Sequence, residues 1–294
     1  MRFPWGPSRA AIAMAVLAAV LLAGCGKKSD SLICLVTDYG ANEEPTAQLK
    51  GAIYGLNAQA HVVDLLHDTG GGDVKQAAYV LDQATSNFAA GTVVVVAVDA
   101  SSKDVPVLVR TRAQKYYLAP DDSVLSFVLA REGLDKAWKL DKEELYRDGS
   151  RNNGTYPAPD VAGPIAARLA LGAKPETLGT PTKSIKVFPI NLPTTAGQNA
   201  TAEILYIDAA GNLVTNIPIK LTPWLKEGNL LRFTFGKQRF SAPLVASTSE
   251  LNDLKPGKYA ALYNPQGRLE ITVVKGSAAH VFNVAVGQTF LVQP

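Results

Sequence analysis

Apolar runs and amphipathic stretches alternate along the first half of the chain. Three largely apolar runs, rich in β-branched residues, predict strands: Leu32–Thr37, which is expected to be buried, His61–Leu66 and Thr92–Val98. Between them, apolar residues return at helical spacing in residues 47–56 and 74–84, and Asp73 stands where a helix N-cap is expected. Such alternation is typical of a largely parallel sheet with helices on both faces.

The pattern changes in the second half of the chain. The alternation continues less clearly through residues 107–109, 116–118, 124–132 and 160–171, and proline and glycine then interrupt residues 172–198, which predicts a linker. Short strands with turn signals follow, at Glu203–Ile207, Leu230–Phe235, Tyr259–Tyr263, Leu269–Val274 and Thr289–Val292. Their regular spacing predicts a small antiparallel barrel or sandwich.

The N-terminus has the layout of an export signal. Arg2 and Arg9 precede an apolar run at 10–22, which is short for a membrane span. The sequence Leu-Ala-Gly-Cys that ends at Cys25 resembles the bacterial lipoprotein signal, which implies a signal peptide at 1–24, a lipid on Cys25 and a tether at 25–30. We therefore expect a membrane-anchored protein of the bacterial cell envelope, on the outer membrane and facing the periplasm. An ordinary secretory signal with a chance cysteine is the alternative.

The charge, hydrophobic content and cysteine count of the chain argue against some classes of protein. The net charge is +3 and the basic residues are scattered, which argues against a nucleic-acid partner. With 47% hydrophobic residues, the mature chain is expected to be globular. Cys34 is the one cysteine besides Cys25, so we expect a buried, inert thiol and no disulfide.

Carboxylates follow the predicted strands. Asp38 and Asp99 each come after an apolar run, and Asp64 lies near the end of another. Ligands of open α/β sheets bind outside the carboxyl ends of the strands, where a carboxylate can accept hydrogen bonds from a ribose diol, ligate a metal or act as a base. A helix cap or turn is the structural alternative for each. The three histidines show no ligand spacing and no glycine-rich phosphate loop is present, so we expect neither metal nor cofactor.

A series of motifs extends across residues 31–294. In order along the chain, they are Thr37–Gly40, Lys50–Gly51, Val63–His67, Asp73–Ala78, Phe88–Val93, Leu118–Ser126, Asp208–Ile217 and Asn264–Ile271. Together they resemble the S-adenosylmethionine hydroxide adenosyltransferases and their relatives, the fluorinase and chlorinase. The resemblance implies an α/β N-terminal domain with a mainly parallel sheet at 31–190, followed by a small antiparallel β-barrel domain at 198–294.

The resemblance also implies a ligand and an assembly. The family forms homotrimers and binds an adenosyl or nucleoside small molecule where the first domain of one subunit meets the second domain of its neighbour. By this resemblance, Asp38 binds the ribose hydroxyls, Asp208 the methionine amino group and Asn212 the adenine.

The catalytic positions depart from the family pattern. Family hydrolases activate water with an aspartate, an arginine and a histidine. Asp99 matches the aspartate, but its loop, residues 99–104, lacks the arginine and offers Lys103 as a cation without the planar guanidinium fork. Pro157–Asp160 replaces the segment that begins with the histidine. Ala210 and Pro265 replace a phenylalanine and a serine of the binding motifs. Asp99 and Lys103 are therefore the expected catalytic residues.

Three functions follow from this pattern. The first is hydrolysis of S-adenosylmethionine to adenosine and methionine. The second is a lipid-anchored protein of the cell envelope that binds a nucleoside or adenosyl ligand without cutting it, because loss of a general acid or base costs a factor of roughly a hundred to ten thousand. The third is a purely structural role, in which the motifs preserve only the packing of the trimer.

Overall fold

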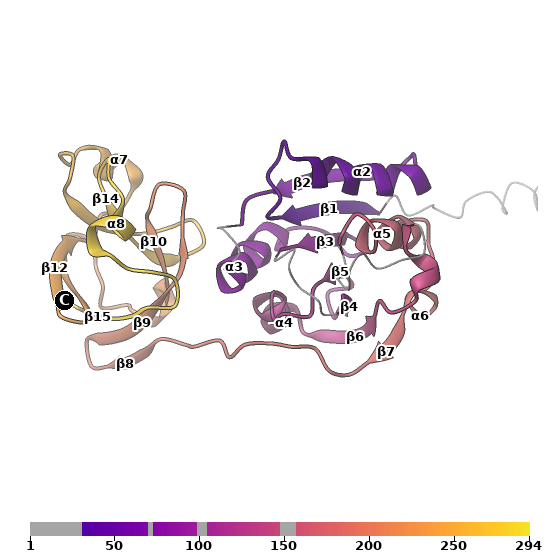
Figure 1. Cartoon of the computed structure of the whole chain (residues 1–294). Helices are drawn as coiled ribbons and strands as arrows, with labels where there is room; N and C mark the ends of the chain where they lie inside the picture. Colours follow the sequence, from indigo (N-terminus) through magenta and orange to yellow (C-terminus); the bar gives the residue numbers. More distant parts are fainter. Residues whose placement is uncertain (1–30, 70–72, 99–104, 148–156) are drawn as a thin grey trace, which may run out of the picture.

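The computed structural model describes residues 31–69, 73–98, 105–147 and 157–294. The predicted signal peptide, the predicted lipidation site Cys25 and the predicted tether lie outside these residues. The chain forms an α/β domain followed by an antiparallel, nearly closed β-barrel domain (Figure 1). The predicted fold class is therefore confirmed. Within the described ranges, no helix is both long enough and apolar enough to cross a membrane.

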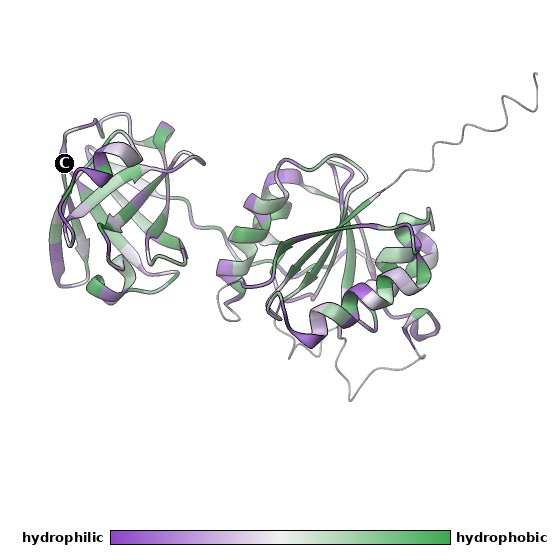
Figure 2. Cartoon of the chain, turned by 90° about the horizontal axis from the view of Figure 1, so that it is seen from above, coloured by the Kyte–Doolittle hydropathy of each residue, from purple (hydrophilic) through white to green (hydrophobic). Residues whose placement is uncertain are grey.

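A seven-stranded sheet forms the centre of the first domain, in the order β2-β1-β3-β5-β4-β6-β7. Its parallel part consists of β2 (His61–Leu66), β1 (Leu32–Thr37), β3 (Val93–Ala97) and β5 (Tyr116–Ala119). The sheet continues with antiparallel pairing through β4 (Val107–Thr111), β6 (Leu134–Lys139) and β7 (Thr180–Thr182). Hydrophobic strands run through the middle of this domain (Figure 2).

Helices cover both faces of the sheet, as the alternation predicts. One core joins the odd-numbered side chains of β1 and β3 to α2 (Glu44–Leu56) and α5 (Ala162–Ala170). The other core joins the even-numbered side chains to α3 (Val74–Thr85) and α4 (Ser126–Glu132). Asp73 caps α3, since its carboxylate accepts hydrogen bonds from the backbone N–H groups of Lys75 and Gln76 at 2.9 and 3.1 Å. Cys34 is free and fully buried, and burial raises its pKa to about 11.

The second domain is an antiparallel sheet in the order β12-β11-β15-β9-β10-β14-β13, and β8 pairs with β9. Its strands are β8 (Thr194–Ala196), β9 (Asn199–Ile207), β10 (Leu213–Pro218), β11 (Leu230–Phe235), β12 (Gln238–Pro243), β13 (Tyr259–Tyr263), β14 (Arg268–Val273) and β15 (Thr289–Gln293). A bridge between Leu244 and Ala261 brings the two ends of the sheet together. Stacked rings fill the interior, and the centroids of Phe240 and Phe282 are 3.8 Å apart.

Several elements were not predicted. The strands β6 and β12 carry mostly polar side chains on their exposed positions, so they lack the apolar run that identified the other strands. The segment 172–198, predicted as a linker, contains the short helix α6 (Pro175–Leu178) and the strands β7 and β8. Two further short helices, α7 (Thr248–Asn252) and α8 (Ala278–Phe282), flank the barrel.

Helix α3 connects the two domains. Lys75 Nζ lies 3.0 Å from Glu203 Oε1 on β9, and the Glu203 side chain is almost completely buried. The Gln76 side-chain carbonyl accepts a hydrogen bond from the Ile207 backbone N–H at 3.2 Å. The Tyr79 ring lies 5.9 Å from the guanidinium carbon of Arg268 on β14. Because these contacts bring together a helix of one domain and strands of the other, they fix how the domains meet.

Candidate functional site

The turn after β1 places Asp38 at the carboxyl end of the parallel strands. The Asp38 backbone N–H donates to the Ala97 carbonyl at 3.1 Å, so this turn is tied to the end of β3. The Gly40 N–H donates to the His67 carbonyl at 2.7 Å, which ties it to the end of β2 as well. Gly40 has a φ of +86°, a conformation that favours glycine. Asp38 therefore occupies the region where open α/β sheets bind ligands.

A chain of polar side chains supports this turn. The Thr37 hydroxyl lies 2.8 Å from His67 Nδ1, and His67 Nε2 lies 3.1 Å from Asp64 Oδ1. Lys50 Nζ donates to Asp64 Oδ2 at 2.6 Å. Burial by itself would raise the pKa of the Asp64 carboxyl, but the hydrogen bonds of Lys50 and His67 outweigh it, so this pKa lies below its usual value. The network joins α2, β1 and β2 behind Asp38.

The side chains of Asp64 and His67 thus contact other protein side chains and support the turn, rather than facing an open ligand site. Thr37 is fully buried and His67 is 9% exposed, so their contact is shielded from water. Sequence reasoning placed Asp64 among the strand-end carboxylates and did not identify Lys50 as its partner. The sequence offered one indication of this pair: the motifs Lys50–Gly51 and Val63–His67, which contain the two residues, follow each other along the chain.

Residues 157–160, which the resemblance aligns with the segment of the catalytic histidine, lie against Tyr39. Burial raises the pKa of the Tyr39 hydroxyl to about 12; a backbone hydrogen bond with Ala158 lowers it, and the charges of Asp38 and Asp160 raise it further. Asp160 Oδ1 in turn accepts a hydrogen bond from Arg147 Nε at 2.7 Å. Residues 157–160 therefore lie beside the Asp38 turn, where they present a carboxylate paired with arginine and no imidazole.

The β9–β10 hairpin turn brings Asp208 and Asn212 together. Asp208 Oδ1 accepts hydrogen bonds from the backbone N–H groups of Ala210 and Asn212, at 2.9 and 2.8 Å. Asp208 Oδ2 accepts one from Asn212 Nδ2 at 2.8 Å. Gly211 has a φ of +83°, and a Cβ atom there would lie 2.1 Å from Ser277 Oγ. The two residues that the resemblance assigns to ligand binding therefore also build their own turn.

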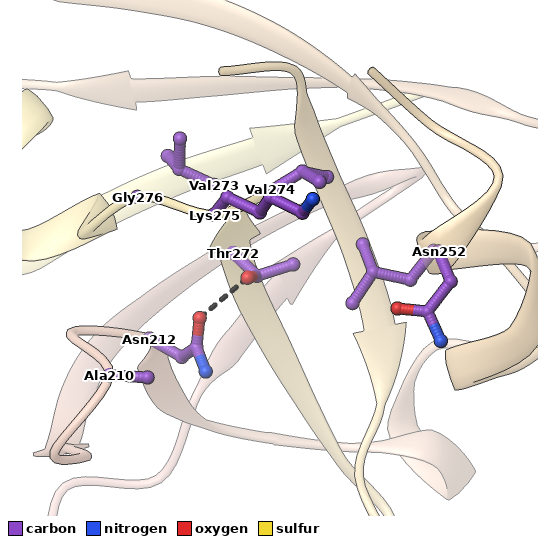
Figure 3. A pocket seen from close by; sticks show the side chains of 9 residues that line it. Ala210, Asn212, Asn252, Thr272, Val273, Val274, Lys275 and Gly276 are labelled. Atoms are coloured by element: carbon purple, nitrogen blue, oxygen red, sulfur yellow. Dashed lines mark hydrogen bonds between the residues drawn. The ribbon is translucent and has the colours of Figure 1, made fainter. Parts of the chain in front are cut away.

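A hollow of about 450 Å³ opens beside this turn. Ala210, Asn212, Thr272 and Lys275 contribute to its wall, and Asn252 approaches from α7 (Figure 3). The Thr272 hydroxyl donates to Asn212 Oδ1 at 2.5 Å, which fixes the orientation of the amide. The volume lies in the range of small-molecule pockets, and the amide retains one N–H for a ligand.

Glu270 on β14 was not identified as a separate candidate, although the motif Asn264–Ile271 contains it. Burial raises the pKa of the Glu270 carboxyl, and the charge of Asp208 raises it further, whereas a hydrogen bond from Asn264 lowers it. The barrel thus places two carboxylates close enough to interact, one in the hairpin turn and one on the neighbouring strand.

The predicted site residues fall into three groups. Asp208 and Asn212 are in direct contact. Asp38 lies in the other domain, at the ends of the parallel strands. The expected catalytic residues Asp99 and Lys103 and the expected lipidation site Cys25 lie outside the described residues.

The fold and these polar regions define a two-domain α/β-plus-barrel protein with candidate ligand-binding side chains at strand ends and in a hairpin turn. Residues 33–179 match the model of the SAM hydroxide adenosyltransferase N-terminal domain, and residues 202–291 match that of the C-terminal domain. The chain belongs to the SAM hydroxide adenosyltransferase family.

Individual relatives agree with this assignment. The chain is 28% identical over 260 residues to an (R)-S-adenosyl-L-methionine hydrolase of Salinispora arenicola, covering 87% of this chain and 95% of the relative. It is 23% identical to the enzyme of the same name from Methanocaldococcus jannaschii, covering 86% and 92%. Among solved structures, an uncharacterized conserved protein from Thermotoga maritima superposes with a TM-score of 0.80 at 26% identity, covering 90% of this chain and 100% of that one.

Proposed function

We propose that this protein is a hydrolase that converts S-adenosylmethionine and water into adenosine and methionine. The observation that carries the proposal is the presence of both family domains in order, with the Asp38 turn and the Asp208–Asn212 turn each held by its own hydrogen bonds. Relatives named as (R)-S-adenosyl-L-methionine hydrolases align over most of the chain and support the same reaction.

The reaction makes modest demands on the protein. The water oxygen forms a bond to the ribose carbon, the carbon–sulfur bond breaks, and its electron pair neutralises the sulfonium as methionine leaves; one proton is released from the water. Because the sulfonium is already a good leaving group, the protein mainly has to orient the ribose and the water. The Asp38 carboxylate suits the ribose diol, and Asn212 can offer its remaining N–H to adenine. Asp99, with Lys103, is our candidate for positioning the water.

The active assembly in this proposal is a homotrimer. Asp38 belongs to the α/β domain, whereas Asp208 and Asn212 belong to the barrel. In the family pattern, the first domain of one subunit meets the second domain of its neighbour, and this arrangement brings the two sets of residues to one ligand. Light scattering of the purified protein tests the assembly, and a monomer at micromolar concentration would contradict it.

A second candidate function is binding without hydrolysis. One observation favours it: residues 157–160 lie beside the Asp38 turn without an imidazole, and the Asp160 carboxylate is paired with Arg147. In this version the protein is anchored to the cell envelope through a lipid on Cys25 and retains an adenosyl ligand or nucleoside. Mass spectrometry of the mature N-terminus tests the anchor, because an unmodified Cys25 would exclude it.

One pair of measurements separates the two functions. Purified protein is incubated with S-adenosylmethionine and the release of adenosine is followed by chromatography, with a heat-inactivated sample as control. Calorimetry then measures the binding of adenosine and S-adenosylmethionine. Adenosine release above the control supports hydrolysis, and binding without release supports the second function. If neither is observed, both proposals are wrong and a structural role remains.

A further inference from the structure

The outer face of the barrel carries two rows of side chains that cross four strands. The first row runs through Ser241 on β12, Arg232 on β11, Gln293 on β15 and Asn199 on β9. The second row runs through Arg239, Thr234, Leu291 and Thr201 on the same strands. The intervening side chains of β11 point inward and are buried, so the rows form the outward surface of this part of the sheet.

The two rows together form a grid of outward-facing side chains, in which Arg232 and Arg239 are diagonal neighbours on adjacent strands. Arg232 lies opposite Ser241, and Arg239 lies opposite Thr234, two positions further along the strand pair. Diagonal neighbours of this kind are about 7–8 Å apart in antiparallel sheets, a separation that long side chains can span. Both arginines are exposed, and together with the hydroxyl and amide groups around them they line a hollow of about 310 Å³.

The two rows contain positive charge and no negative charge. No aspartate or glutamate lies in either row, and within the part of the chain that the structure describes neither Arg232 nor Arg239 forms an ion pair. In the α/β domain, by contrast, three of the five described arginines, Arg110, Arg131 and Arg147, each pair with a carboxylate. Two neighbouring charges of the same sign repel each other, and an anion placed between them would remove that cost.

The donors on this face match one ligand chemistry. A guanidinium group offers a planar fork of N–H donors that suits the oxygens of a phosphate group, and two forks on a diagonal can bind one phosphate from both sides. Ser241 and Thr234 add hydroxyl donors beside them. We propose that the grid formed by Arg232, Arg239, Ser241 and Thr234 is a binding site for phosphate esters, separate from the hollow beside Asn212, with which it shares no lining residue.

A phosphate ester can come from solution or from a lipid headgroup, so the experiment has two arms. In the first, calorimetry measures the binding of glycerol 3-phosphate to the full chain. In the second, the full chain is sedimented with phosphatidylglycerol vesicles, and phosphatidylcholine vesicles correct for binding through the N-terminal segment. Each arm compares the wild type with the double variant Arg232→Gln/Arg239→Gln. The matched control is Lys226→Gln/Lys255→Gln, which removes two exposed charges elsewhere on the barrel.

We expect the wild type to bind in at least one arm. The arginine double variant should weaken that binding by about tenfold or more, whereas the lysine control should change it by less than about threefold. Binding of glycerol 3-phosphate assigns the site to soluble esters, and binding confined to anionic vesicles assigns it to lipid headgroups. Absence of binding in both arms overturns the proposal, as does an equal loss in the lysine control. Far-ultraviolet circular dichroism verifies that each variant remains folded.

Discussion

The two halves of the candidate site are built in different ways. In the α/β domain, the Asp38 turn depends on residues far apart in the sequence, because Thr37 contacts His67, which is held in turn by Asp64 and Lys50. In the barrel, Asp208 and Asn212 form their turn with hydrogen bonds that span five residues. The first carboxylate is placed by its surroundings, whereas the second organises its own loop. The two halves should therefore respond differently to substitution and to pH.

Of the substitutions considered, Gly211→Ala is expected to lower the free energy of unfolding most, because it disrupts the Asp208–Asn212 turn of the barrel. A Cβ atom at this position meets Ser277 Oγ at 2.1 Å, and the φ of +83° is strained for any other residue. Overpacking and strain together should lower the free energy of unfolding by about 3 kcal/mol. Urea denaturation measures this change.

Gly228→Ala is the matched control for that substitution. Gly228 has a similar φ of +77°, and nothing lies within 4 Å of its added Cβ atom. We expect only the backbone cost, about 1 kcal/mol. Equal losses in the two variants would show that the Ser277 contact does not matter.

Thr37→Val should disrupt the strand-end half. The substitution keeps the shape of a fully buried side chain but removes the hydroxyl that contacts His67 Nδ1. The imidazole then loses a partner in a water-excluded position, which should cost about 2 kcal/mol of unfolding free energy. Thr289→Val, at an exposed position of β15, should change stability by less than about 0.5 kcal/mol. An unchanged melting transition for Thr37→Val would show that the network does not support the turn.

Asp38→Asn and Asp208→Asn should separate ligand binding from stability. Asp38→Asn is expected to weaken adenosine binding by about tenfold or more through loss of a charged acceptor. Asp208→Asn should also destabilise the protein by about 1 kcal/mol, since its two oxygens accept hydrogen bonds within the turn.

Paired calorimetric titration and thermal unfolding give both quantities for each variant. Glu227→Gln, an exposed substitution on the barrel, controls for the loss of one negative charge. If adenosine binding by Asp38→Asn matches that of the wild type, the Asp38 turn has a structural role only.

The smallest expected effects concern pH, and they have opposite signs in the two halves. The pKa of Asp64 is lower in the folded protein than in the unfolded chain. Its ionised carboxylate therefore stabilises the fold at a pH above the unfolded-state pKa, and this contribution is lost as the pH falls through the folded-state pKa. The pKa of Glu270 is higher in the folded protein than in the unfolded chain. Its contribution to stability is therefore present at a pH below the unfolded-state pKa and is lost as the pH rises through the folded-state pKa.

Chemical denaturation between about pH 3 and pH 7 tests this contrast, because unfolded carboxyl groups titrate near pH 4. Relative to the wild type, Asp64→Asn should be less stable at pH 7 and Glu270→Gln more stable. The same sign of change in both variants would contradict the contrast.

The sequence predicted the parts of the fold that depend on continuous apolar runs. The strand Leu32–Thr37 and the N-cap at Asp73 are confirmed, because burial on both sides and a local hydrogen bond leave clear patterns. The strand β6 was missed because only Ala137 and Trp138 are buried among its otherwise more exposed residues. Its position depends on pairing with β4 and β7, which local composition does not report.

The candidate site was predicted unevenly for a similar reason. The family resemblance identified Asp208 and Asn212, whose contact is local. The support of Asp38 depends on Lys50 and His67, which lie on different elements and meet only after the sheet has formed. The four residues of the proposed phosphate-ester site lie within residues 232–241, but only the register of the β11–β12 hairpin shows that the two arginines are diagonal neighbours.

The order of strands in the barrel has a consequence for how the protein is made. The last strand, β15, lies between β11 and β9 in the sheet, so its residues complete the pairing of strands synthesised much earlier. Until Thr289–Gln293 has left the ribosome, β9 and β11 each lack a partner on one side, and unpaired edges of this kind promote aggregation. The barrel can therefore close only after Thr289–Gln293 has been synthesised, and a variant that lacks β15 should be unable to close its sheet.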